Sequence, residues 1–143
     1  MKSTYFHRVH QQTKTRFWIN NPTMEQAKRA IEEGAIGCTT NPSYVSKLFE
    51  SEEDMRVVRR MIDLLLPYEK DDSVLASKVQ QMMVGRLADL FLPLYRSSGG
   101  TEGFVTIQGD PFAETDTSRI IKEGLENHEI AENICIKIPV TKW

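Results

Sequence analysis

The sequence predicts an α/β fold in which short parallel strands alternate with helices. Short runs rich in β-branched and aromatic residues are separated by longer segments whose apolar residues recur at helical spacing. The connecting segments are long enough for a helix to cross over the sheet, as the parallel pairing of successive strands requires. At 143 residues, with 40% hydrophobic and 27% charged content, the chain is long enough to bury one domain core.

The N-terminal segment, residues 1–14, is polar and has no apolar periodicity, so we expect it to form a tail or a covering arm. Residues 15–143 form the predicted domain. It begins with TRFWIN (15–20), whose aromatic and β-branched residues favour a strand.

The first predicted helix follows this strand. Thr23 can cap its first turn, Gln26 completes a capping box, and Gly34 ends the helix. The apolar face comprises Met24, Ala27, Ala30 and Ile31. A second strand is predicted at 35–39, and beyond it Asn41 precedes a proline, which favours an extended turn.

Two further helices are predicted before the third strand. The first ends at Pro67, and the second begins after the Asp-Asp-Ser segment 71–73. Pro93 lies inside the second pattern, so we expect a kink or an early end there. The apolar positions at helical spacing are Met55, Val58, Met61, Ile62 and Leu65, then Leu75, Val79, Met82, Met83, Leu87, Leu90 and Leu94.

The remaining pattern adds a strand at 103–108, a helix at 116–131 and a strand at 133–139, which gives the order βαβα(α)βαβ. Strands joined in this way pair in parallel through right-handed crossovers. Four such units are half of a (β/α)8 barrel, or TIM barrel, whose usual length is about 250 residues. An open doubly wound sheet is the competing architecture, although no Gly-rich phosphate loop follows the first strand.

Composition excludes several classes of function. The formal net charge is −2 and no Lys/Arg cluster alternates with aromatic residues, which excludes a nucleic-acid partner. There is no signal-peptide core and no run of about 18 apolar residues, so we expect a soluble, cytoplasmic protein without a membrane partner. Cys38 and Cys135 are far apart and lack ligand-spaced histidines, so we expect buried reduced thiols and no metal site.

Polar side chains stand at the carboxyl ends of all the predicted strands, where parallel α/β folds place their active sites. They are Asn20, residues 39–41, Gln108 with Asp110, and residues 137–141. Each also has an interpretation as an ordinary turn residue, because Asn and Asp near proline favour turns.

Lys137 is the most informative of these residues. Period-two alternation places the isoleucines of 134–138 on one face of the strand and Cys135, Lys137 and Pro139 on the other. In a sheet buried on both faces, an ammonium group must be paired, reach the mouth of the fold or lose its proton. A neutral lysine is a nucleophile toward a carbonyl, so the position favours Schiff-base chemistry. A lysine paired with a carboxylate is the alternative.

Three motifs resemble one enzyme family. GCTTNPS after the second strand, GFVTIQGD for the third and ICIKIPVT for the fourth are similar to the corresponding strands of the transaldolase and fructose-6-phosphate aldolase family. The likeness runs from about Thr15 to Thr141. It implies a (β/α)8 barrel in which a lysine forms a Schiff base with a ketose phosphate, without a metal or an organic cofactor.

The resemblance also implies roles for individual residues. It places the Schiff base on Lys137, hydrogen bonding to substrate hydroxyls on Asn41, and the lining of the same pocket on Thr39. Gln108 falls where transaldolases carry a glutamate and the aldolases a glutamine that helps to hold the catalytic water. The partner would be a small-molecule sugar phosphate of pentose phosphate metabolism.

The sequence departs from the family pattern in two places. Asn20 stands where the family carries an aspartate that assists proton transfer; an amide cannot act as a general base, although it can still orient a hydroxyl. The chain also ends after the fourth strand, whereas family members continue for four more. We therefore expect a truncated product holding only the first four βα units, with two unpaired sheet edges that lead to a homo-oligomer or to poor stability.

Three functions are consistent with these features. The leading hypothesis is a transaldolase-like Schiff-base enzyme of which this chain carries the lysine half, with Lys137, Gln108 and Asn20 as catalytic residues. The alternative is a non-catalytic sugar-phosphate-binding relative or an inactive remnant. A third interpretation is an unrelated open-sheet binding module. The sequence leaves open the choice between transaldolase and aldolase activity, and the acceptor.

Overall fold

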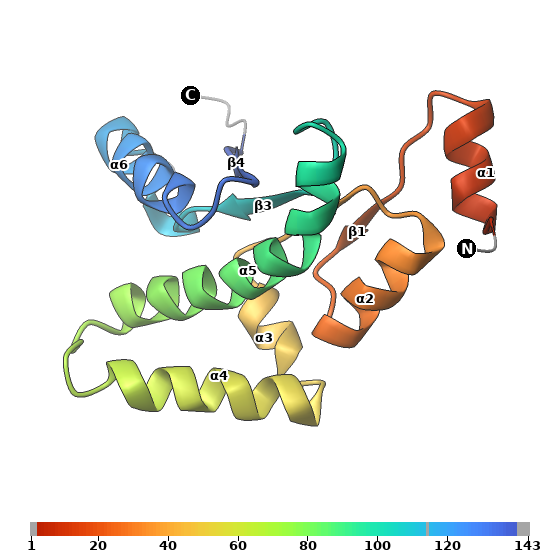
Figure 1. Cartoon of the computed structure of the whole chain (residues 1–143). Helices are drawn as coiled ribbons and strands as arrows, with labels where there is room; N and C mark the ends of the chain where they lie inside the picture. Colours follow the sequence, from red (N-terminus) through yellow and green to blue (C-terminus); the bar gives the residue numbers. More distant parts are fainter. Residues whose placement is uncertain (1–2, 114, 140–143) are drawn as a thin grey trace.

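A computed structural model describes residues 3–113 and 115–139 of the chain (Figure 1). Its sheet contains four parallel strands in the order β1-β2-β3-β4. They are β1 (Trp18–Asn20), β2 (Gly37–Thr39), β3 (Phe104–Gln108) and β4 (Ile134–Lys137). Successive strands lie side by side without a reversal of order, which is the arrangement of a barrel wall rather than of a doubly wound sheet. The α/β fold is thus consistent with the predicted partial TIM barrel.

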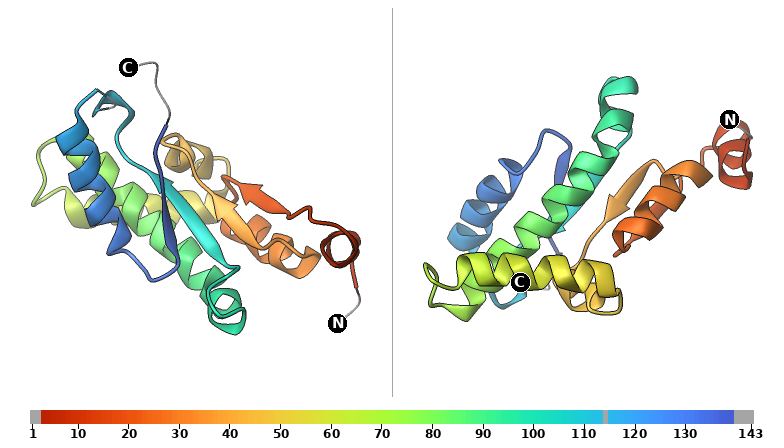
Figure 2. Two further views of the ribbon diagram at one scale, coloured as in Figure 1. Left: turned by 90° about the horizontal axis from the view of Figure 1, so that it is seen from above. Right: turned by 60° about the horizontal axis from the view of Figure 1, so that its bottom comes forward.

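Seven helical segments accompany these strands in the described part of the chain. They are α1 (Tyr5–Gln12), α2 (Met24–Glu33), α3 (Tyr44–Leu48), α4 (Glu52–Leu65), α5 (Asp72–Ser97), the 3-10 turn η1 (Pro111–Ala113) and α6 (Thr117–His128). Helix α5 packs along β3, and α4 packs against α5. Figure 2 shows α2, α5 and α6 following one another along the sheet.

The predicted caps of α2 are confirmed. The Thr23 side chain accepts a hydrogen bond from the Gln26 backbone N–H, and the Gln26 side chain accepts one from the Thr23 N–H. Gly34 ends the helix in the left-handed conformation, with φ of 102°. Glycine is suited to this position because it has no Cβ to clash there.

Helix α5 differs from its prediction at Pro93. The helix continues through Pro93 to Ser97, so the expected early end is wrong. Phe91 is fully buried in the core and Leu94 packs against that core, which holds both sides of the proline in helical conformation. A kink at Pro93 stays a prediction.

Helix α1 lies within the segment that was expected to be a tail or a covering arm. Thr4 caps it, and the Thr4 hydroxyl also donates to the Glu33 carbonyl at the end of α2, at 2.6 Å. The ring of Phe6 stacks on that of Phe17 with centroids 4.2 Å apart. The cap and these tertiary contacts stabilise α1, which is amphipathic, so the expectation of a segment without helical periodicity is wrong.

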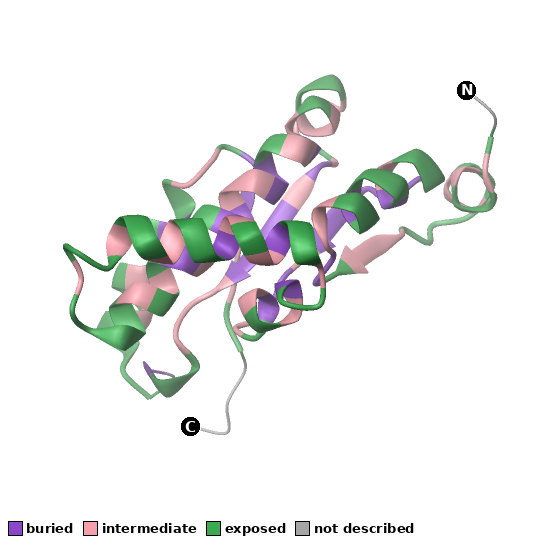
Figure 3. Ribbon diagram, turned by 90° about the horizontal axis from the view of Figure 1, so that it is seen from below, coloured by how far each residue is buried: buried purple, intermediate pink, exposed green. Residues whose placement is uncertain are grey.

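The two faces of the sheet differ in burial. The covered face, which packs into the core beneath the helices, consists of Ile19, Cys38, Val105, Ile107, Ile134 and Ile136. The open face alternates with it and carries Asn20, Thr39, Thr106, Gln108, Cys135 and Lys137; among these, only Thr106 is buried. Figure 3 shows buried residues concentrated on the strands and on the helix sides turned toward them.

This arrangement corrects two expectations. Cys135 is exposed on the open face, whereas Cys38 is buried as predicted. Ile138 lies beyond the end of β4 and is 57% exposed, so only Ile134 and Ile136 of the three isoleucines reach the core. The exposure of Asn20 and Cys135 also shows that the two faces of this sheet are not equally buried in the described residues.

Candidate functional site

The side chain of Lys137 binds two oxygen atoms at the carboxyl end of β2. Its Nζ donates to the carbonyl oxygen of Thr40 and to Oδ1 of Asn41, each at 2.6 Å. Lys137 is the last residue of β4, and Thr40 and Asn41 follow β2 directly. Parallel strands bring their carboxyl ends to the same edge of a sheet, so residues about a hundred positions apart in sequence meet there.

Asn20 links the other two polar side chains at this edge of the sheet, Thr39 and Asn41. Its Oδ1 accepts hydrogen bonds from the Thr39 hydroxyl at 2.9 Å and from Nδ2 of Asn41 at 3.0 Å. Because Nδ2 of Asn41 is bonded to Asn20, Oδ1 of the same amide is turned toward Lys137. One hydrogen-bonded network therefore includes Lys137, Asn41, Asn20 and Thr39.

Gln108 lies beside this network without joining it. It is the register partner of Lys137 on β3 and is half-buried. Its backbone carbonyl accepts from Nε2 of Gln80 at 3.3 Å, and its side chain makes no hydrogen bond to another described residue. The Gln108 amide thus stands next to the lysine and is available to bind another group.

Asp110, the other polar residue predicted at the end of β3, pairs with helix α6 and not with the lysine. Its Oδ2 accepts from Nη2 of Arg119 on α6 at 2.6 Å. Glu123 on the same helix accepts the backbone N–H of Asp110 at 2.9 Å. These contacts fasten the loop after β3 to α6. Of the predicted segment 137–141, residues 140 and 141 lie outside the described part of the chain.

Asn21 belongs to the site, although nothing in the sequence assigns it a role beyond that of an ordinary turn residue. It is 8% exposed and has a φ of 47°, in the left-handed region. Its Oδ1 accepts the backbone N–H of Asn41 at 2.9 Å, and its own N–H donates to the Thr39 carbonyl at 2.9 Å. An asparagine two positions before the helix cap was the available signal, since asparagine is enriched in this backbone conformation.

Thr40 was predicted as part of the polar turn 39–41, without a role of its own. It is fully buried, and its hydroxyl donates to the Thr106 carbonyl at 2.7 Å. Its backbone N–H donates to the Thr106 hydroxyl at 3.3 Å. The turn after β2 is therefore held to β3 on one side and to the end of β1 on the other. No sequence pattern marks Thr40, because its contact with Lys137 uses a backbone atom.

Burial lowers the pKa of the Lys137 amine below its ordinary value. Desolvation disfavours the charged ammonium form. Among the ion pairs of the described residues none includes Lys137, so the predicted alternative of a carboxylate partner is not supported there. Its two oxygen partners are neutral groups, an amide and a peptide carbonyl.

Neither a metal-binding cluster nor a membrane-spanning helix occurs in the part of the chain that the structure describes. No group of three or more His, Cys, Asp or Glu side chains lies close enough together there to hold a metal ion. No described helix is both long and apolar enough to cross a membrane.

Comparison with known proteins identifies relatives of this chain. The sequence model of the family described as Transaldolase/Fructose-6-phosphate aldolase matches residues 17–143. The transaldolase of Mycobacterium ulcerans (strain Agy99) is 30% identical over 112 residues, which cover 77% of this chain and 29% of that protein. Transaldolase 1 of Streptomyces avermitilis is 32% identical over 122 residues, covering 81% of this chain and 30% of that protein.

A third relative is more distant but aligns over more of the chain. The transaldolase of Thiobacillus denitrificans (strain ATCC 25259 / T1) is 24% identical over 135 residues, covering 87% of this chain and 36% of that protein. The chain thus spans about a third of the length of these relatives. The match over most of its residues shows that the chain belongs to the transaldolase/fructose-6-phosphate aldolase family.

Proposed function

We propose that Lys137 is the Schiff-base nucleophile of a transaldolase-type aldol reaction on ketose phosphates, with this chain carrying the lysine part of the site. The observation that carries the proposal is the position of Nζ, 2.6 Å from the Thr40 carbonyl oxygen and 2.6 Å from Oδ1 of Asn41. Family membership supports the reaction class and the substrate class.

The two acceptors of the Lys137 amine can be satisfied by its neutral form as well as by the ammonium form. A neutral amine has two hydrogens and one lone pair, whereas an ammonium group has three hydrogens and no acceptor capacity. Thr40 and Asn41 accept two hydrogens, and no third acceptor is found among the described residues. In the neutral form these two acceptors would engage both hydrogens and leave the lone pair free for a reactant. Burial lowers the pKa of the same group.

In the proposed reaction this lone pair attacks the ketose carbonyl carbon. The resulting carbinolamine loses water to give an iminium ion, which accepts the electron pair released when the neighbouring carbon–carbon bond breaks. The proton that the substrate hydroxyl releases in this cleavage would pass to the water held beside Gln108. Asn41 holds the amine, and Gln108, beside Lys137 in the register, would hold the water that leaves and returns. Asn20 and Thr39 orient the Asn41 amide and line the pocket.

A non-catalytic sugar-phosphate-binding relative is the second candidate, and the identity of Asn20 favours it. An amide cannot accept the proton that aldol cleavage releases from a substrate hydroxyl. Asn20 still accepts hydrogen bonds from Thr39 and Asn41. The variant Asn20→Asp separates the two candidates. A large gain in aldol turnover on adding the carboxylate would favour the binding relative, because the native site would then lack a proton acceptor, whereas native turnover that the carboxylate does not raise would favour the enzyme.

Three finer expectations remain proposals. Pentose phosphate metabolism as the pathway and the cytoplasm as the location rest on the family resemblance. Self-association rests on the outer strands, since β1 and β4 each pair with a single strand in the described residues. A second copy or a further set of strands could add to either edge.

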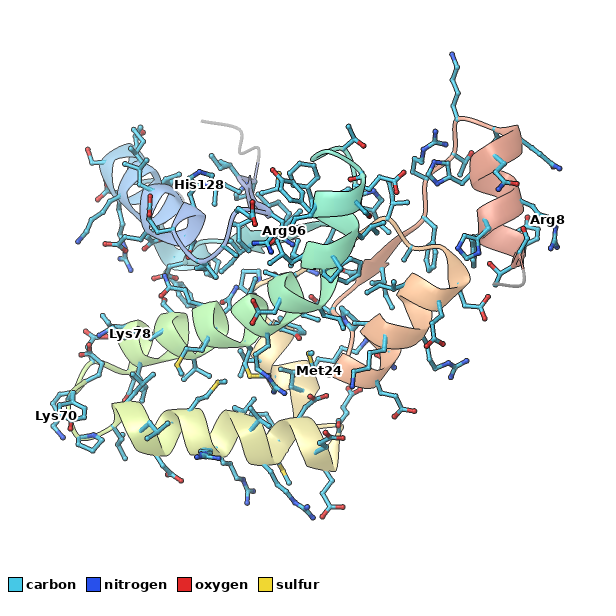
Figure 4. The ribbon with its side chains drawn as sticks, in the orientation of Figure 1. Arg8, Met24, Lys70, Lys78, Arg96 and His128 are labelled. Atoms are coloured by element: carbon cyan, nitrogen blue, oxygen red, sulfur yellow. The ribbon has the colours of Figure 1, made fainter. Side chains whose placement is uncertain are left out.

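Borohydride trapping tests the proposal. The protein is incubated with fructose 6-phosphate or dihydroxyacetone and sodium borohydride, and peptides are mapped by mass spectrometry. We expect a reduced adduct on Lys137 that disappears in Lys137→Met. Lys78→Met is the matched control, because Lys78 pairs with Glu69 near the α4–α5 turn, well away from β4 (Figure 4). Saturable ketose binding without an adduct would favour the binding relative, and equal labelling of all lysines would refute both.

A further inference from the structure

Asn21 combines a left-handed backbone, a buried amide and a hydrogen bond to the lysine-binding turn. We propose that Asn21 is a positioning residue that orients the Thr40–Asn41 peptide group, and through it the amine of Lys137. This inference deepens the proposed function and rests on it for the role of the amine. The positioning itself does not depend on the reaction, because it concerns only the hydrogen bonds that join Asn21, the Thr40–Asn41 peptide and Lys137.

The peptide group between Thr40 and Asn41 is bonded at both ends. Its N–H donates to Oδ1 of Asn21 at 2.9 Å, and its carbonyl oxygen accepts from Nζ of Lys137 at 2.6 Å. A peptide group is planar and trans, so its N–H and C=O point in opposite directions. The bond to Asn21 therefore fixes the plane of the peptide and, with it, the direction in which the carbonyl faces the lysine.

The same bond also acts on the strength of the carbonyl as an acceptor. Hydrogen bonds in a chain polarise one another, so donation by the N–H strengthens acceptance by the C=O of the same peptide. Asn21, the peptide and Lys137 form such a chain. Asn20 acts in parallel on the Asn41 side chain, whose Oδ1 is the second acceptor of Lys137. The two neighbouring asparagines thus control the two acceptors separately.

The choice of asparagine at position 21 fits this role. A φ of 47° is accessible to few residues other than glycine, asparagine and aspartate. Glycine would satisfy the backbone with the least strain, but it has no acceptor for the Asn41 N–H. Asn21 is only 8% exposed, and burying its amide there lowers the stability of the fold unless the amide is hydrogen-bonded. Its bond to Asn41 supplies that partner.

Two substitutions separate positioning from backbone conformation. Asn21→Gly keeps access to the left-handed region and removes the acceptor, whereas Asn21→Asp keeps both. The rate of borohydride-trapped adduct formation on Lys137 with dihydroxyacetone is measured at a pH above the half-point of the amine in each variant. We expect Asn21→Gly to slow trapping by about tenfold, because small misplacements of a reacting group reduce rates strongly. Asn21→Asp should retain the rate within about twofold.

A second readout is independent of the reaction. Hydrogen exchange of the Asn41 backbone amide, followed by NMR, should be faster in Asn21→Gly and remain slow in Asn21→Asp, and the Lys137 ε-methylene signal should shift only in Asn21→Gly. Unchanged trapping together with an unchanged Lys137 signal in Asn21→Gly would overturn the inference. If the unsubstituted protein forms no adduct, the proposed function fails, and the exchange and Lys137 signals alone decide the role of Asn21.

Discussion

Cys38 on the covered face and Lys137 on the open face respond to the same physical effect with opposite chemical results. Burial raises the pKa of the Cys38 thiol to about 12. Burial lowers the pKa of the Lys137 amine. In both cases desolvation favours the uncharged form. The uncharged thiol is a poor nucleophile, whereas the uncharged amine is the reactive species.

The comparison shows why the two faces suit different tasks. The covered face keeps Cys38 fully buried among apolar side chains, and no group there stabilises a charge on it. The open face keeps Lys137 half-buried, so a reactant can reach the amine that burial has made less basic. Partial burial thus lowers the basicity of the amine without closing access to it.

The largest expected difference between the faces is in thiol reactivity. Cys38 is buried and Cys135 is exposed. With iodoacetamide at pH 8 we expect Cys135 to be alkylated at least about a thousandfold faster, because the thiolate fraction of Cys38 is very small and access to it is blocked. Peptide mapping by mass spectrometry over time measures both rates. If Cys38 and Cys135 were alkylated at comparable rates in the native protein, the proposed difference between the two faces of the sheet would be refuted.

A smaller difference is expected in stability. Ile107 and Gln108 are neighbours on β3, but Ile107 is 1% exposed on the covered face and Gln108 is half-buried on the open face. Ile107→Ala should lower the free energy of unfolding by about 2–5 kcal/mol through lost burial and the cavity left behind. Gln108→Ala should change it by about 0.5 kcal/mol or less. Urea denaturation measures both values.

The matched control for this pair is Ile107→Val, which removes a single methylene group and should cost about 0.5–1.5 kcal/mol. A loss for Gln108→Ala that equals the loss for Ile107→Ala would show that the open face contributes to the core. It would contradict the division of the sheet into two faces.

Much of the fold could be predicted because local signals agreed with the tertiary structure. The cap at Thr23, the stop at Gly34 and the helical spacing over α4 and α5 each mark an element that the structure contains. The sequence did not indicate α1 or α3. Helix α1 depends on tertiary contacts such as the Phe6–Phe17 stack, and α3 has five residues, too few to show periodicity.

The candidate site, like the fold, could be predicted only in part from the sequence. The rule that parallel strands meet at their carboxyl ends predicted that Asn20, residues 39–41 and Lys137 would lie at one edge, and the family resemblance added a binding role for Asn41. The acceptor role of the Thr40 carbonyl could not be predicted, because a backbone atom of any residue could fill it. The contribution of Asn21 depends on its φ of 47° and on one hydrogen bond, neither of which a sequence pattern specifies.

The central claim is that the amine of Lys137 is held neutral more readily than an ordinary lysine, and its direct titration tests that claim. The ¹³Cε and ¹⁵Nζ shifts of Lys137 would be followed against pH by NMR. We expect the half-point of Lys137 to lie below the ordinary value of 10.5, so that the neutral, reactive amine forms at a lower pH than it does in an ordinary lysine. A half-point at or above 10.5 would show that the ammonium form is favoured and would contradict the claim.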